Sequence, residues 1–246
     1  MHHFFVDPSQ VLDEKVTIKG NDVNHIKNVL RMKVGEELLI SNGIDMDYYC
    51  KIESISDDEI VAVVLNEEFA GTELPCEIYL FKGLPKSDKM ELIIQKAVEL
   101  GAKAIVPVAT KRCVVKLDDK KEASKLKRWQ AISESAAKQS RRVIIPEVMP
   151  VMSFKEAINL AKTFDLGIIP YENFKDMEET RNILSKLDKG MKIGIFIGPE
   201  GGFDDSEISY AMENGVKPIS LGKRILRTET AGLAILSVIM FRIEEM

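Results

Sequence analysis

With 246 residues, 45% of them hydrophobic and 30% charged, the chain has the composition of a globular protein of one large or two smaller domains. Its formal net charge of −5 argues against indiscriminate binding to polyanions. The three histidines and the cysteines Cys50, Cys76 and Cys113 lack metal-ligand spacing, so we expect no metal site and reduced thiols in a cytoplasmic protein.

Residues 1–70 are predicted to form a small β-rich domain. Apolar runs separated by turn residues indicate five strands, which would close into a barrel or a strongly curled sheet. A short helix is expected at 21–30, where three apolar residues share one face. The predicted strands are residues 4–6, 16–18, 37–41, 47–55 and 59–69. Residues 71–75 are interpreted as a linker.

Residues 76–246 alternate between strand and helix patterns, which predicts an α/β domain with a mostly parallel sheet covered on both faces. The expected strands are residues 77–81, 104–109, 165–170, 192–197 and 217–220. The expected helices are residues 88–100, 123–139, 153–162, 176–187, 205–214 and 228–245.

The last predicted helix is apolar nearly all round. Such a helix is either central to its domain or buried in a subunit interface. Its longest apolar run, residues 233–241, is too short to cross a bilayer. The first residues of the chain also lack the apolar core of a signal peptide. We therefore expect neither export nor membrane insertion.

A glycine-rich turn, IGPEGGF at residues 197–203, follows one predicted strand and precedes a helix. Its glycines permit positive φ and close approach of another group to the backbone. Asp204 and Glu207 have capping-box spacing, which fixes the start of the next helix. Strand-to-helix turns of this kind bind ligands in α/β proteins, although a turn without a ligand is the equally simple reading.

A second loop, LGKRILRTETA at residues 221–231, also joins a strand to a helix. Neither loop matches the dinucleotide fingerprint or the P-loop, which disfavours a Rossmann cofactor or a P-loop nucleotide. Lys223, Arg224 and Arg227 favour an anionic partner over a merely solvated basic loop. Residues 111–142 add eleven Lys and Arg against four Asp and Glu, a local excess that favours contact with RNA or phosphate over a solvated helix face.

The two loops resemble the signature loops of the RsmE family, the 16S ribosomal RNA uridine-N3 methyltransferases of the SPOUT superfamily. Weaker similarity extends along the whole chain, through residues 4–6, 25–32, 89–101 and 134–146. The resemblance implies a PUA-like β-barrel at 1–70 and an α/β domain with a trefoil knot at 76–246. It also implies S-adenosylmethionine as cofactor, 16S ribosomal RNA in the small subunit as partner, and a homodimer.

Cofactor contacts are expected from three loops. Backbone without a β-carbon can hydrogen-bond adenine and ribose, and the apolar residues beside it offer a bed for adenine. Glu172 would accept from ribose hydroxyls, whereas Tyr171 is more simply read as a packing residue. The predicted cofactor residues are Pro170, Tyr171, Glu172, Ile197, Gly198, Pro199, Glu200, Gly201, Gly202, Leu221, Gly222, Ile225, Leu226, Thr228 and Ala231.

Catalysis at uridine N3 requires the loss of a proton and stabilisation of the resulting charge on the base. We assign charge stabilisation to Arg227 and contact with donor or base to Glu229, which is equally a helix-start charge. Arg142 is expected to act from the partner subunit.

RNA contacts are expected from both domains. His3 stands where the family usually has Arg. The predicted RNA-binding residues are His3, Arg31, Lys33, Arg112, Lys116, Arg128, Lys138 and Arg142. Two alternatives stay open: methylation of another RNA position, and a non-catalytic RNA-binding or ribosome assembly protein.

Overall fold

The computed structural model describes residues 1–69 and 71–244. The predicted end of the first domain at residue 70 and of the last helix at residue 245 lie outside these residues. The chain divides into two compact units, Met1–Glu73 with Ala137–Ile145 and Leu74–Ala136 with Pro146–Met246. Each unit has its own sheet. Residues 137–145, placed by the sequence in the second predicted domain, group with the first unit.

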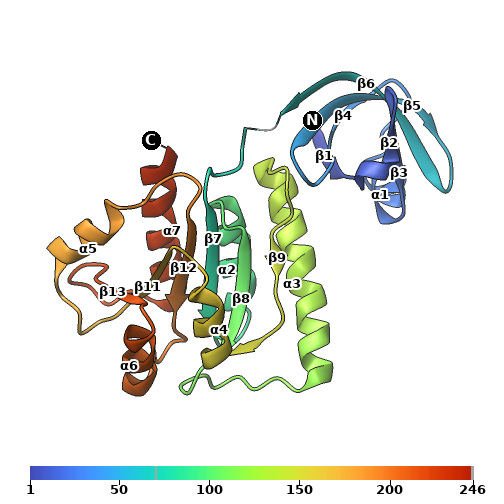
Figure 1. Cartoon of the computed structure of the whole chain (residues 1–246). Helices are drawn as coiled ribbons and strands as arrows, with labels where there is room; N and C mark the ends of the chain where they lie inside the picture. Colours follow the sequence, from blue (N-terminus) through green and yellow to red (C-terminus); the bar gives the residue numbers. More distant parts are fainter. Residues whose placement is uncertain (70, 245–246) are drawn as a thin grey trace. The chain divides into compact units, whose positions relative to one another are not determined.

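The first unit is a strongly curled sheet of six strands in the order β1, β4, β5, β6, β3, β2 (Figure 1). Its strands are β1 (His2–Phe5), β2 (Val11–Leu12), β3 (Lys15–Lys19), β4 (Glu37–Ser41), β5 (Met46–Ile55) and β6 (Glu59–Phe69). β1 runs parallel to β4, and the other neighbouring strands are antiparallel. The additional strand, β2, was missed because two residues are too few to show alternation.

The curl follows from the pairing of the two longest strands. The register between β5 and β6 shifts between Tyr49 and Cys50 and again between Ile52 and Ser54. Such irregularities increase local twist and bend a sheet. The concave face holds a core in which Phe4, Ile18 and Ile40 are fully or almost fully buried.

The helix predicted at 21–30 is present at 21–29 but consists of two parts. An α-helical turn, α1 (Asn21–Asn24), continues into a π-helical segment, His25–Val29. Val23 and Ile26 are the buried residues of the two segments. The prediction of one apolar face is correct, but the wider π-helical winding was not visible in the spacing.

The second unit contains a seven-stranded sheet in which every pair of neighbouring strands is parallel. Its main path is β10, β8, β7, β12, β11, β13, and β9 pairs with β8. Its strands are β7 (Glu77–Gly83), β8 (Ala104–Ala109), β9 (Glu147–Val148), β10 (Met152–Ser153), β11 (Leu166–Pro170), β12 (Lys192–Ile197) and β13 (Lys217–Ile219). The predicted α/β class with a parallel sheet is confirmed.

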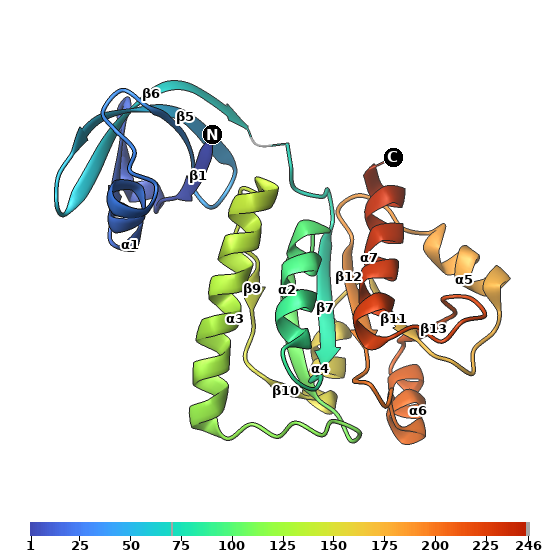
Figure 2. The ribbon, with the colours of Figure 1, turned by 180° about the vertical axis from the view of Figure 1, so that it is seen from behind.

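Helices cover both faces of this sheet, as the views from opposite sides show (Figures 1 and 2). The helices are α2 (Lys89–Glu99), α3 (Asp119–Ser140), α4 (Phe154–Ala161), α5 (Met177–Leu184), α6 (Asp205–Glu213) and α7 (Thr228–Glu244). On one face, α4 and α6 pack with aromatic residues of the strands, including Phe81 and Phe196, whose rings are stacked at 4.4 Å. On the other face, α2 packs against α7, and α7 against β12.

The segment before α7 positions the site. β13 lies at an edge of the sheet, so residues 220–227 return from that edge toward β12, against which α7 packs. This return brings three loops that follow neighbouring strands to one end of the sheet. The trefoil knot implied by the resemblance stays a prediction.

The terminal helix is only partly buried within its unit. Ile235, Leu236 and Ile239 are buried, whereas Val238 is 48% and Phe241 63% exposed. No helix of residues 1–69 and 71–244 is long and apolar enough to cross a membrane.

Candidate active site

A pocket of about 880 Å³ lies at the carboxyl ends of β11, β12 and β13. Parallel strands place the loops that follow them at a common edge, where α/β proteins bind ligands. Residues of 170–177, 197–203 and 220–231 line the pocket together with Lys89 of α2. Every residue that the sequence predicted for the cofactor lies in this lining, and so does Arg227.

The glycine turn is held by close contacts that exclude a side chain at Gly198. A β-carbon on Gly198 would lie 2.9 Å from the carbonyl carbon of Gly202. Gly202 has φ of 67°, a left-handed conformation that favours glycine. The predicted capping box is confirmed: Asp204 caps α6, and Glu207 Oε2 accepts a hydrogen bond from the Asp204 amide at 2.9 Å.

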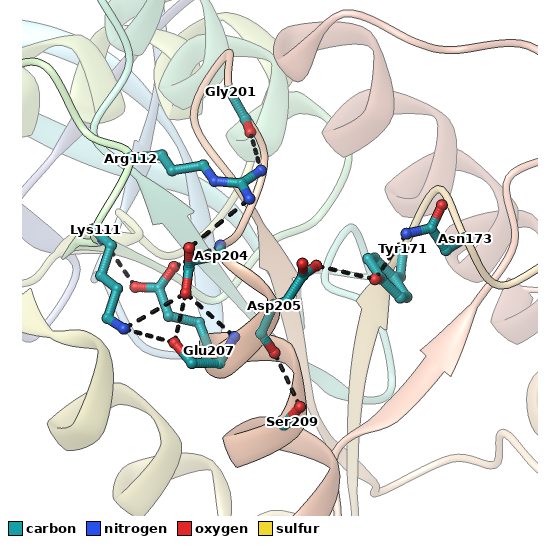
Figure 3. A network of polar contacts seen from close by, with 10 residues as sticks. Lys111, Arg112, Tyr171, Asn173, Gly201, Asp204, Asp205, Glu207 and Ser209 are labelled. Atoms are coloured by element: carbon teal, nitrogen blue, oxygen red, sulfur yellow. Dashed lines mark hydrogen bonds and ion pairs between the residues drawn. The ribbon is translucent and has the colours of Figure 1, made fainter.

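Two residues after β8 support the glycine turn from outside the pocket lining (Figure 3). The Lys111 amide donates to Glu207 Oε1 at 2.9 Å, and Arg112 Nη1 donates to the Gly201 carbonyl at 3.0 Å. The Arg112 guanidinium also lies 3.8 Å from the Asp204 carboxylate. Arg112, predicted to contact RNA, therefore binds the turn in this structure.

Tyr171 is tied by a hydrogen bond to the start of α6 (Figure 3). Its hydroxyl donates to Asp205 Oδ1 at 3.2 Å and accepts from Asn173 Nδ2 at 2.8 Å. Its ring also packs against the core between the sheet, α4 and α6. Both readings of Tyr171 made from the sequence, pocket lining and packing residue, therefore describe its position.

A cluster of lysine and glutamate side chains lies at one side of the pocket and contributes Lys89 and Glu200 to its lining. Lys89 Nζ lies 3.1 Å from Glu200 Oε1 and 3.5 Å from Glu229 Oε2. The hydrogen bond to Glu200 raises the pKa of Lys89. The Lys86 amide donates to Glu200 Oε1 at 3.1 Å. Glu229 is not part of the lining, and its buried Oε2 has no hydrogen-bond partner among the described residues.

Lys82, the last side chain of β7 before Gly83, is fully buried. Its Nζ donates to the carbonyls of Gly83 and Gly198, each at 2.7 Å. Burial lowers the pKa of Lys82 to about 7. Sequence reasoning missed both Lys82 and Lys89. A charged residue at the end of the apolar run Ile78–Phe81 was the available signal for Lys82.

Arg142 is not brought to the pocket. It belongs to the first unit, is 3% exposed and forms an ion pair with Glu73, whose carboxylate also accepts from the Val143 amide at 3.1 Å. The guanidinium is thus held by a carboxylate of its own unit, and the expected action of Arg142 from the partner subunit stays a prediction.

His3 is likewise engaged within the first unit. It is 8% exposed, with Nε2 2.6 Å from Ser41 Oγ and Nδ1 3.3 Å from the Lys138 carbonyl. Burial lowers its pKa, so the ring is neutral at neutral pH and lacks the positive charge of an arginine.

The other predicted RNA-binding residues are either exposed or held in ion pairs. Arg31, Lys33 and Lys116 are exposed. Arg128 Nε lies 2.8 Å from Glu91 Oε1, and Lys138 Nζ lies 3.1 Å from Asp22 Oδ1. Within residues 1–69 and 71–244, no group of three or more His, Cys, Asp or Glu side chains could hold a metal ion.

The fold and the site together define an RNA methyltransferase. Residues 72–240 match the family model of the RNA methyltransferase domain, and residues 18–65 match the RNA methyltransferase PUA domain. The chain is 39% identical to ribosomal RNA small subunit methyltransferase E of Bacillus subtilis, over 99% of this chain and 98% of that protein. The chain belongs to the ribosomal RNA small subunit methyltransferase E family, which confirms the resemblance seen in the two loops.

Solved structures agree with this assignment. The ribosomal RNA small subunit methyltransferase E of Neisseria gonorrhoeae, bound to S-adenosyl methionine, has a TM-score of 0.86 and 32% identity, covering 98% of this chain and 97% of its own. A putative methyltransferase of Legionella pneumophila in complex with the same cofactor has a TM-score of 0.86 and 30% identity, covering 97% and 96%.

Proposed function

We propose that this protein transfers a methyl group from S-adenosylmethionine to N3 of a uridine in the 16S ribosomal RNA of the small subunit. One observation carries the proposal: the three loops that follow β11, β12 and β13 enclose a single pocket, and this pocket contains all the residues expected at the donor site. The relatives named for small-subunit ribosomal RNA methylation support the substrate. Because the substrate belongs to the ribosome, we place the protein in the cytoplasm.

The pocket fits the donor in size and chemistry. A volume of about 880 Å³ lies within the range of sites for ligands of this size. Gly198, Gly201 and Gly202 offer backbone without side-chain obstruction, and Ile197 and Leu226 supply apolar surface. When bound, S-adenosylmethionine supplies the electrophilic methyl group. Glu172 and Glu200 provide negative charge in the lining, which favours a cationic sulfonium ligand.

The loop 221–227 presents positive charge at the same pocket. Lys223, Arg224 and Arg227 line it and are exposed, so a polyanion can reach them. Uridine N3 must lose its proton before it attacks, and negative charge then develops on the base. We assign to Arg227 the stabilisation of this charge, since a preorganised cation at a partly enclosed site lowers the barrier. Glu229 does not line the pocket, and we assign it the role of positioning Lys89, which does.

We further propose that the protein works as a homodimer through the exposed apolar face of α7. Val238 and Phe241 lie on this face, and Leu92 of the adjacent helix α2 is 45% exposed. Large apolar side chains exposed on packed helices are typical of protein–protein contacts when they lie together. We thus expect one face of α7 to be buried in the core of its own chain and the opposite apolar face to be buried against a second copy.

The test is incubation of the protein with labelled S-adenosylmethionine and small ribosomal subunits that lack the modification, followed by nucleoside mass spectrometry. We expect 3-methyluridine. A different methylated nucleoside would replace the uridine-N3 proposal with methylation at another RNA position. Absence of donor binding by calorimetry would favour a non-catalytic RNA-binding or assembly protein.

A further inference from the structure

The carbonyl of Gly198 is held by two side chains from different parts of the second unit. Lys82 Nζ, from the end of β7, donates to it at 2.7 Å, and the Thr228 hydroxyl, at the start of α7, donates to it as well. Lys82 also donates to the Gly83 carbonyl at 2.7 Å. The first carbonyl of the glycine turn is therefore fixed to one strand and to one helix.

β7 and the glycine turn pack so closely at Gly83 that a side chain there would collide with Pro199. A β-carbon on Gly83 would lie 2.6 Å from Pro199 Cδ and 2.8 Å from Pro199 N. β7 and β12 are paired so that Lys82 lies opposite Ile197, the residue before Gly198. Lys82 therefore reaches the turn from the neighbouring strand at the point where the turn leaves the sheet.

Burial of the Lys82 ammonium group costs free energy because the charge loses its hydration, and no ion pair among the described residues offsets this cost. Within the described part of the chain, no carboxylate lies within 4.0 Å of its Nζ. The charged or titratable groups that act on it from neighbouring elements are Cys113 after β8, Glu200 in the turn, Glu229 on α7 and Lys89 on α2. Structures keep such destabilising groups mainly where they serve a site.

We propose that Lys82 is a positioning residue for the methyl donor, whose protonated amine fixes the Gly198 carbonyl and thereby the shape of the turn that receives S-adenosylmethionine. The proposal rests on the proposed function, because it assigns the donor to this turn. Hydrogen bonds from a charged donor are about twice as strong as neutral ones. Loss of the proton from Lys82 therefore loosens the turn.

A dependence of donor affinity on pH follows. Because the pKa of Lys82 is lowered to about 7, the residue is protonated below neutral pH and largely neutral at pH 8.5. Affinity for S-adenosylmethionine should therefore weaken as the pH rises from 6 to 8.5. The amino group of the donor also titrates in water, so only the difference between wild type and Lys82 variants reports on Lys82.

The experiment measures the dissociation constant of S-adenosylmethionine by calorimetry between pH 6 and 8.5. It compares wild type with Lys82→Gln, which keeps two N–H donors without charge, and with Lys82→Met, which keeps length without donors. We expect Lys82→Met to bind roughly tenfold or more weakly at pH 6. Lys82→Gln should bind with intermediate affinity and lack the part of the pH dependence that is specific to wild type. Lys103→Met, at the opposite end of the sheet, is the matched control and should follow wild type.

Hydrogen exchange in the absence of S-adenosylmethionine independently tests whether Lys82 holds the Gly198 carbonyl. Amides of residues 200–204 should exchange faster in Lys82→Met than in wild type or Lys103→Met. Unchanged exchange and unchanged affinity in a folded Lys82→Met protein would overturn the inference and leave the proposed function intact. A wild-type protein that binds no donor at any pH would overturn the proposed function, while exchange would still decide whether Lys82 holds the turn.

Discussion

The hydroxyl of Thr228 donates a hydrogen bond to the carbonyl of Gly198, which lies 30 residues earlier in the chain. The first residue of α7 is thereby joined to the first glycine of the glycine turn. Both residues line the pocket, so the bond connects two of its three loops directly. The position of α7 and the shape of the turn are consequently coupled.

Replacement of Thr228 by valine should weaken donor binding. Valine keeps the branched shape and removes the hydroxyl, so the loss of about 1 kcal/mol for one hydrogen bond corresponds to a roughly fivefold higher dissociation constant for S-adenosylmethionine. Thr228→Ser retains the hydroxyl and serves as the control in the same calorimetric titration. Equal affinities of the valine and wild-type proteins would contradict the coupling.

Gly198→Ala should damage the turn more than Gly201→Ala. A β-carbon on Gly198 meets backbone at 2.9 Å, whereas one on Gly201 meets only the side chain of Arg112, at 3.5 Å or more, which is an ordinary contact. We expect Gly198→Ala to lower the unfolding midpoint by several degrees, corresponding to about 1–2 kcal/mol, and to lose most donor affinity. Gly201→Ala should unfold like wild type in thermal denaturation. Equal midpoints for both alanine variants would show that the turn adapts.

Arg227→Ala should slow catalysis without weakening donor binding. If Arg227 stabilises charge on the base, its loss removes an interaction made mainly in the transition state, and kcat should fall by roughly 100-fold. The dissociation constant for S-adenosylmethionine should stay within about twofold. Single-turnover methylation of small subunits measures the rate, with Arg181→Ala on α5 as the control. A weaker donor complex with an unchanged rate would assign Arg227 to donor binding instead.

Phe241→Asp should convert the proposed dimer into a monomer. The substitution places a charge at the centre of an apolar contact, where an unpaired carboxylate is strongly disfavoured. Size-exclusion chromatography with light scattering would report the mass. Met212→Asp alters another exposed apolar residue, on α6, and should leave the mass unchanged. A wild-type protein with the mass of a single chain would refute the dimer.

The stability of the protein should rise with pH above neutrality because of Lys82. Its pKa is about 7 in the folded state, against 10.5 for an ordinary lysine, so between these values the unfolded chain binds the additional proton. The free energy of unfolding therefore increases with pH by at most about 1.4 kcal/mol per pH unit, roughly 2 kcal/mol from pH 7 to 9. Urea denaturation of wild type and Lys82→Met would show this rise only in wild type. Parallel profiles would contradict the lowered pKa.

Local pattern was sufficient for most of the architecture. Alternation and apolar runs placed the main strands of both sheets, because side chains repeat every two residues in a strand. The two loops were recognisable because a glycine turn and a helix cap depend on residues adjacent in sequence. The short strands β2, β9 and β10 were missed, since two residues carry no period.

The roles of charged residues were decided by the tertiary structure. His3, Arg112 and Arg142 are predicted to contact RNA, and in the structure each also contacts a group distant in sequence: Ser41, Gly201 and Glu73. Sequence specifies the chemistry of a side chain, but neither its distant partners nor its exposure. Both depend on which surfaces pack together.

The sequence by itself therefore determined the α/β class, the β-rich first unit and the loops that line the pocket, because these depend on short-range periodicity and turn chemistry. Only the tertiary structure decided that Lys82 and Thr228 hold Gly198 and that Lys89 joins Glu200 to Glu229. These contacts link residues far apart in the chain. They form only when parallel strands align their carboxyl ends and the chain returns across them, an arrangement that no local pattern records.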